Sequence, residues 1–197
     1  MILDEPYEVE VKLPLADKDT MKKTILQAGG VALNSEFQVD SYYDHPCRSF
    51  SKTDESVRLR HRTRTEGPTT TESGQAPVEL TYKGPKIDKK TKTRIEYTVY
   101  LDENGMESMS QILLNTGFKH VANISKHREF FDIDGITVTL DTVTDVGRYI
   151  EFELMADGKD GMNAARERIL KLVENLGMDE KDMVRESYLY LYFENTS

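Results

Sequence analysis

Apolar and polar residues alternate along several short segments of the chain, and this pattern predicts β-strands. A period of two residues places apolar side chains on one face of a strand and polar side chains on the other. The six clearest segments are Tyr7–Leu13, Ser56–Arg62, Val78–Tyr82, Thr93–Leu101, Ile136–Asp141 and Tyr149–Leu154.

Three other segments have the spacing of amphipathic helices, with apolar residues at every third or fourth position. The apolar stripes are Met21/Ile25/Ala28, Met106/Met109/Ile112/Leu113 and Met162/Ala165/Ile169/Leu172/Val173/Leu176. Glycine follows each stripe, and it is the residue best suited to end a helix in a left-handed conformation.

An aromatic segment follows each predicted helix, and we expect each of these segments to form a strand. The three segments are SEFQVDSYYD, ISKHREFFDI and ESYLYLYF, so a helix–glycine–strand unit would occur three times. Asp134-Gly135, between two apolar runs, predicts a tight antiparallel hairpin. Strands with single helices between them indicate the α+β class.

Long charged side chains recur on the polar faces of the predicted strands. The groups are Glu8/Glu10/Lys12, Arg58/Arg60/Arg62/Arg64, Arg94/Glu96, Lys126/Arg128, Thr137/Thr139/Asp141 and Glu151/Glu153. Two interpretations are open. The polar face is solvated, or the sheet curls into a barrel whose charged interior serves a ligand, since burying so many charges is otherwise too costly.

The overall charge limits the classes of partner. The chain has 197 residues, with 26 Lys and Arg against 35 Asp and Glu, and a formal net charge of −9. We therefore expect no general nucleic-acid binding. Short apolar runs and an N-terminus without a signal-peptide pattern predict a cytoplasmic protein with no membrane partner. Its single cysteine, Cys47, excludes a disulfide framework within the chain.

The residue types on the charged faces suit one kind of ligand. Converging Arg and Lys side chains neutralise a polyanion such as a triphosphate. Glutamates two residues apart offer the oxygen ligands that Mg²⁺ and Mn²⁺ prefer. Both sets in one cavity would indicate a metal–triphosphate substrate, and no Walker A, GxGxxG or HExxH motif points elsewhere.

The motifs resemble those of the CYTH superfamily, the triphosphate tunnel metalloenzymes, and most closely its class IV adenylyl cyclase branch. Glu8-Val9-Glu10-Val11-Lys12 matches the ExExK signature of that superfamily. The other matching stretches, in chain order, are DSYY from Asp40, RSF from Arg48, DESVRLR from Asp54, LTYKGP from Leu80, RIE from Arg94, KHR from Lys126, LD from Leu140 and GRYIEFE from Gly147.

The resemblance implies one CYTH-like domain over residues 1–197, an eight-stranded antiparallel β-barrel with amphipathic helices packed outside. It implies an Mg²⁺ or Mn²⁺ site with Glu8 and Glu10 as ligands, together with Glu151 and Glu153. Glu8, Glu10 and Lys12 would be catalytic, and Glu96 and Asp141 would have supporting roles. The implied phosphate-binding residues are Lys12, Arg58, Arg60, Lys83, Arg94, Lys126 and Arg128.

The resemblance also implies the reaction, conversion of ATP to cyclic AMP and pyrophosphate. Two alternatives stay open. One is hydrolysis of inorganic, nucleoside or thiamine triphosphate, and the other is a non-catalytic module that binds polyphosphate or nucleotide. The family makes a homodimer an expectation as well. The Gly-, Pro- and Thr-rich stretch Thr65–Pro77 is predicted to be a loop.

Overall fold

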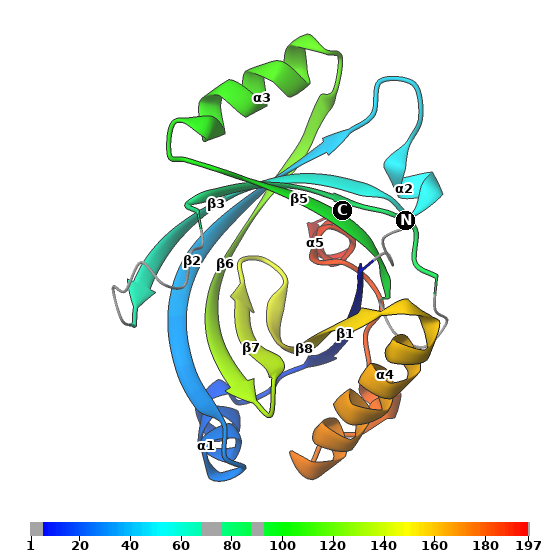
Figure 1. Ribbon diagram of the computed structural model, residues 1–197. Coiled ribbons are helices and arrows are strands. Elements are labelled where there is room, and N and C mark those ends of the chain that lie inside the picture. Colours follow the sequence, from blue (N-terminus) through cyan, green and yellow to red (C-terminus); the bar gives the residue numbers. More distant parts are fainter. Residues whose placement is uncertain (1–5, 68–75, 88–92, 197) are drawn as a thin grey trace.

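The computed structural model describes residues 6–67, 76–87 and 93–196, which fold into a closed eight-stranded antiparallel barrel in the order β1-β5-β4-β3-β2-β6-β7-β8 (Figure 1). The strands are β1 (Pro6–Pro14), β2 (Val31–Asp44), β3 (Ser56–Glu66), β4 (Val78–Lys83), β5 (Arg94–Leu101), β6 (Lys119–Ile133), β7 (Ile136–Val143) and β8 (Gly147–Asp157). The predicted barrel is confirmed. Part of the Thr65–Pro77 loop lies outside the described residues.

In the described part of the chain, five α-helices accompany the barrel. They are α1 (Lys18–Gln27), α2 (Phe50–Thr53), α3 (Gly105–Asn115), α4 (Gly158–Asn175) and α5 (Tyr188–Thr196), with a 3-10 turn, η2, at Glu180–Asp182. Asp17 accepts hydrogen bonds from the first turn of α1. The predicted glycine is present after α3, where Gly117 has a φ of 96°. No helix in the described part of the chain is long and apolar enough to cross a membrane.

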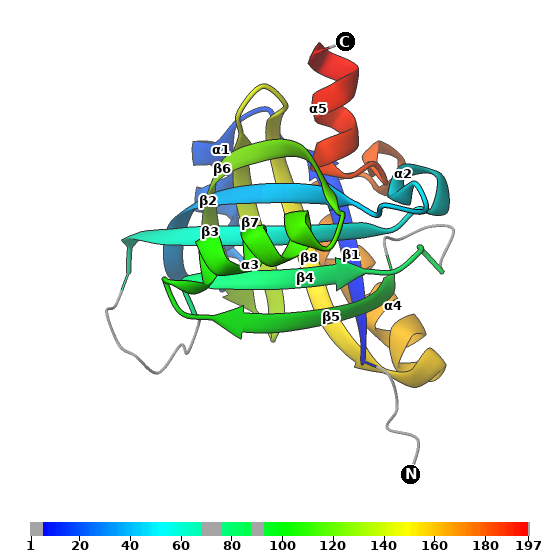
Figure 2. The ribbon, with the colours of Figure 1, turned by 90° about the horizontal axis from the view of Figure 1, so that it is seen from above.

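The apolar faces of the strands point outward and are covered by helices. In one layer, α4 lies over β1 and β8, and α1 lies against β6, where Lys22 contacts Glu129. Ile25 of α1 and Ile169 of α4 belong to one buried apolar cluster with Phe152 and Val138. In a second layer, α3 lies over β3 and β4 through residues such as Leu113 (Figure 2). Because the hydrophobic layers are outside, the alternation of each strand turns its polar side chains into the barrel.

The C-terminal aromatic segment corrects one prediction, because ESYLYLYF forms α5 and no strand. The helix–glycine–strand unit therefore occurs twice. Strand β8 is already paired with β1 and β7, so the segment has no free edge there. A helix satisfies its backbone hydrogen bonds locally, and Ser187 accepts one from the amide of Tyr190 at the first turn.

Helix α5 closes one end of the barrel interior. Tyr188 is buried in an apolar cluster with Tyr42, Ile124 and Val143, from β2, β6 and β7. The helix stands within the outline of the barrel in Figure 1 and projects from it in the view from above in Figure 2. Its aromatic residues thus form a wall of the interior space.

Candidate active site

The barrel encloses a cavity of about 980 Å³, and residues of α2 and α5 contribute to its walls. Charged side chains from seven strands line it, and the predicted residues among them are Glu8, Glu10, Arg58, Arg60, Lys83, Arg94, Glu96, Lys126, Arg128, Glu151 and Glu153. The pleat brings these residues together from segments far apart in sequence. Lys12 and Asp141 lie behind the lining, fully buried.

The arginines of the cavity are held by carboxylates. Arg60 donates from Nε and Nη2 to both oxygens of Asp40, at 2.5 and 2.8 Å. Arg128 makes the same two-point contact with Asp141, at 2.7 and 2.5 Å, and also bonds to Glu151. Such forked contacts fix the plane of a guanidinium group.

Two of these carboxylates were missed as site residues by the sequence analysis. Asp40 is buried between β3 and β6. Glu79 lies at the centre of an arginine group: it accepts a hydrogen bond from Arg58 at 2.8 Å and another from Arg62, and lies 3.4 Å from Arg60. Both residues lie in strands whose apolar and polar residues alternate, and this pattern indicates that they face the interior. Their partners follow only from the strand register.

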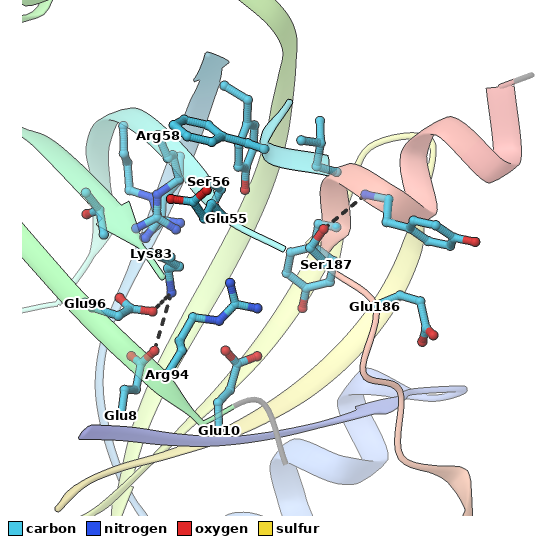
Figure 3. Close-up of a pocket in the computed structure, with 18 of the residues that line it drawn as sticks. Glu8, Glu10, Glu55, Ser56, Arg58, Lys83, Arg94, Glu96, Glu186 and Ser187 are labelled. Atoms are coloured by element: carbon cyan, nitrogen blue, oxygen red, sulfur yellow. Dashed lines mark hydrogen bonds and ion pairs between the residues drawn. The ribbon is translucent and has the colours of Figure 1, made fainter. Parts of the chain in front are cut away.

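Glu8, Lys83 and Glu96 form a linked group on β1, β4 and β5 (Figure 3). Lys83 lies 3.4 Å from Glu8 and also contacts Glu96. Burial opposes the charged form of Glu8, yet the Lys83 ammonium and a hydrogen bond with Glu96 lower its pKa to about 2. Burial and the charge of Glu8 outweigh Lys83 at Glu96 and raise its pKa to about 7. One proton is thus shared near Glu96 around neutral pH.

Glu10 and Glu153 are direct neighbours across the β1–β8 ladder. Burial and the charge of Glu8 raise the pKa of Glu153 to about 8, with smaller contributions from Glu151 and Glu10, while Arg128 opposes the rise. Carboxylates that repel one another in a shared space suit a divalent cation. Within the described residues, however, no three acidic, His or Cys side chains are close enough to hold a metal ion.

The balance of acidic and basic side chains in the cavity also favours a ligand that brings its own cation. Eleven acidic and nine basic side chains line it, so the interior carries no excess of positive charge for a triphosphate. A polyanion in this cavity needs added cations, and the carboxylates of β1 and β8 are the groups that would hold Mg²⁺ or Mn²⁺.

Lys126 and Lys12 differ from the other basic residues of the site. Burial, with the charges of Arg128 and Arg60, lowers the pKa of Lys126 to about 7, although Asp40 opposes the shift. Lys12 donates to the backbone carbonyl of Glu186, and its ammonium lies 4.3 Å from the centre of the Tyr188 ring. The structure therefore places Lys12 against the segment that leads into α5.

Aromatic and aliphatic side chains form the remaining wall of the cavity. They come from β2, from α2 and from α5, and include Tyr42, Phe50, Leu189 and Phe193. The cavity thus joins a charged region between the strands to a wall at α2 and α5 in which aromatic and aliphatic side chains lie among charged ones such as Glu55 and Glu194. A ligand that contacts both has an anionic part and a flat or apolar part.

The sequence matches the CYTH domain family over residues 6–188. It is 33% identical over 184 residues to "Putative adenylate cyclase MJ0240" of Methanocaldococcus jannaschii, which covers 93% of this chain and 97% of that protein. It is 27% identical over 184 residues to adenylate cyclase CyaB of Aeromonas hydrophila, covering 92% of this chain and 86% of that protein.

Solved structures share the barrel. The PH1819 protein of Pyrococcus horikoshii superposes with a TM-score of 0.83 at 37% identity, covering 95% of this chain and 98% of that one. A Hippeastrum protein, described as an adenylyl cyclase homologue with a dominant triphosphatase activity, has the same fold at a TM-score of 0.64 and 12% identity, covering 96% and 95%. Since the family match spans nearly all of the sequence, the chain belongs to the CYTH family, whose members are generally enzymes that act on triphosphates.

Proposed function

We propose that the chain is an adenylyl cyclase that requires Mg²⁺ or Mn²⁺ and converts ATP to cyclic AMP and pyrophosphate. One observation carries the choice of a nucleotide over an inorganic triphosphate: the side chains of Tyr42, Phe50, Leu189 and Phe193 line the cavity beside its charged strands. An inorganic triphosphate has no apolar or aromatic group to pack on these side chains, whereas a nucleoside has one. The names of the two relatives agree with this choice.

The basic side chains would bind the phosphate oxygens. Arg58, Arg60, Lys83, Arg94, Lys126 and Arg128 line the cavity from β3, β4, β5 and β6. Because carboxylates already hold the guanidinium groups of Arg60 and Arg128 in fixed planes, little reorganisation is needed when charge develops on the leaving pyrophosphate.

Glu8 and Glu10 would hold the divalent cation together with Glu151 and Glu153. A bound Mg²⁺ or Mn²⁺ would supply charge neutralisation of the phosphates and a lower pKa for the ribose 3′-hydroxyl. The reaction forms the bond from the 3′-oxygen to the α-phosphorus, releases the 3′-hydroxyl proton to water, and breaks the bond from that phosphorus to the pyrophosphate oxygen. Tyr188 and the rest of α5 close one end of the interior, which limits the access of competing water.

Hydrolysis of a triphosphate is the alternative, because the same charged residues would bind tripolyphosphate or a nucleoside triphosphate. The Hippeastrum structure shares this barrel and carries that activity in its description. A module that binds without reacting is a third possibility, which the same assay addresses.

Product analysis distinguishes these functions. The protein is incubated with ATP and Mg²⁺, with ATP and EDTA, and with tripolyphosphate and Mg²⁺, and the products are separated by chromatography. We expect cyclic AMP and pyrophosphate from ATP only when the metal is present. ADP with phosphate would identify a triphosphatase, and turnover in EDTA would contradict the metal requirement.

A further inference from the structure

Asp40 lies beneath the cavity and contacts three cations that line it. It is 1% exposed, on β2 between β3 and β6, and its carboxylate is outside the cavity lining. Arg58, Arg60 and Lys126 each have a side chain in the lining. Asp40 thus contacts side chains that line the cavity but does not itself line it.

The contacts of Asp40 differ in kind. Arg60 is held by two hydrogen bonds, from Nε to Oδ1 and from Nη2 to Oδ2. Lys126 Nζ is 3.5 Å from Oδ2, and Arg58 Nη1 is 3.9 Å from the same oxygen. These cations hold the pKa of Asp40 well below its usual range despite its burial, so the carboxylate is charged whenever the protein is folded at neutral pH.

A buried carboxylate under three cations has two possible effects on a bound triphosphate. Its charge cancels part of their attraction, which weakens binding. Its fixed position orders long side chains that each lose about 2 kcal/mol of rotamer entropy when immobilised, which strengthens binding. The two effects have opposite signs, so an experiment separates them.

We infer that Asp40 is a positioning residue that holds Arg60 and Lys126 in the orientation in which they bind a triphosphate. This inference rests on the proposed function of the cavity. The forked contact with Arg60 favours it, because a carboxylate that only balanced charge would not need two aligned hydrogen bonds. Asp141 makes an equivalent forked contact with Arg128 on the neighbouring strands β6 and β7.

The test is calorimetric titration of the full chain with tripolyphosphate in the presence of Mg²⁺. Asp40→Asn removes the charge and one acceptor while keeping the shape. The matched control is Glu129→Gln, at a carboxylate on the outer face of β6 that also contacts two cations, Lys18 at 2.5 Å and Lys22 at 2.6 Å. Both changes remove a carboxylate with two or more ionic partners, but only Asp40 underlies the cavity.

We expect Asp40→Asn to weaken triphosphate binding by about tenfold or more, and Glu129→Gln to bind as the parent does. Binding by Asp40→Asn that equals or exceeds that of the parent would overturn the inference and identify Asp40 as a charge-balancing residue. If Asp40→Asn does not fold, Asp40→Glu keeps the charge but displaces the fork by one methylene. Parental binding by Asp40→Glu would then overturn the inference as well. A parent that does not bind tripolyphosphate would instead contradict the proposed function.

Discussion

Replacing Arg128 by Gln should destabilise the protein far more than replacing Arg58 by Gln. Arg128 contacts Asp141, Glu151 and Glu153, with distances of 2.5 Å to Asp141 and 3.5 Å to Glu153. Removing one partner of a buried ionic group costs about 3–5 kcal/mol, because the charges left behind are desolvated and repel one another. For a protein of this length the melting temperature should fall by about 10 °C.

Arg58 is the matched control because each of its two carboxylate partners keeps two further cations within 4 Å. Glu79 keeps Arg60 and Arg62, and Asp40 keeps Arg60 and Lys126. Arg58→Gln should therefore cost only about 1 kcal/mol, the value of a single hydrogen bond. Urea unfolding of the metal-free parent and of both variants measures these costs.

The cost at Arg128 should also depend on pH in one direction. Arg128 lowers the pKa of Glu153, which is about 8 in the parent, so its removal raises that pKa further. Around pH 8–9 the folded variant then binds more protons than the folded parent, while the unfolded chains do not differ. Stability relative to the parent must therefore fall as pH rises, by about 1 kcal/mol between pH 6 and pH 9. Equal costs for Arg128→Gln and Arg58→Gln, or a larger deficit at pH 6, would refute this account.

Two further substitutions test the charged interior of the barrel and the helix α5 that closes one end of it. The pKa of Glu153 is raised to about 8, so its charge costs stability, a loss that begins above about pH 4.5 and is complete above pH 8. Glu153→Gln should therefore stabilise the metal-free protein by about 3 kcal/mol at pH 9 and have little effect near pH 4.5, which urea unfolding at the two pH values measures. Tyr188→Phe removes the 2.8 Å hydrogen bond to buried Asp141 and should cost about 1–2 kcal/mol, whereas Tyr190→Phe, at a residue that is 52% exposed, should change the melting temperature by less than about 2 °C.

Alternation along the chain predicted most of the barrel because the two faces of each strand differ so strongly. Glu8, Glu10 and Lys12 alternate with valines, and that pattern alone places them on one face. The same rule failed for ESYLYLYF, where every second residue is aromatic although the segment is a helix. The segment is helical because the barrel is already closed and offers it no strand edge to pair with. The sequence of the segment carries no information about that closure.

The sequence also could not predict which acidic side chain contacts which basic side chain. Arg60 meets Asp40 because β2 and β3 are in a register that places them opposite each other, twenty residues apart along the chain. A shift of one residue would turn either side chain outward. The sequence therefore predicts which residues are interior, and only the register reveals that acidic groups outnumber basic ones in the cavity.

The central claim is that the cavity binds a triphosphate together with a divalent cation, and melting curves test it most directly. The parent is measured in EDTA, with Mg²⁺ alone, with tripolyphosphate in EDTA, and with both ligands. Because the interior has no excess of positive charge, we predict a large shift only with both, about 8 °C or more at a thousandfold excess over the dissociation constant, and its loss in Glu10→Gln but not in Glu129→Gln. The same shift with tripolyphosphate in EDTA, or an undiminished shift in Glu10→Gln, would contradict the account.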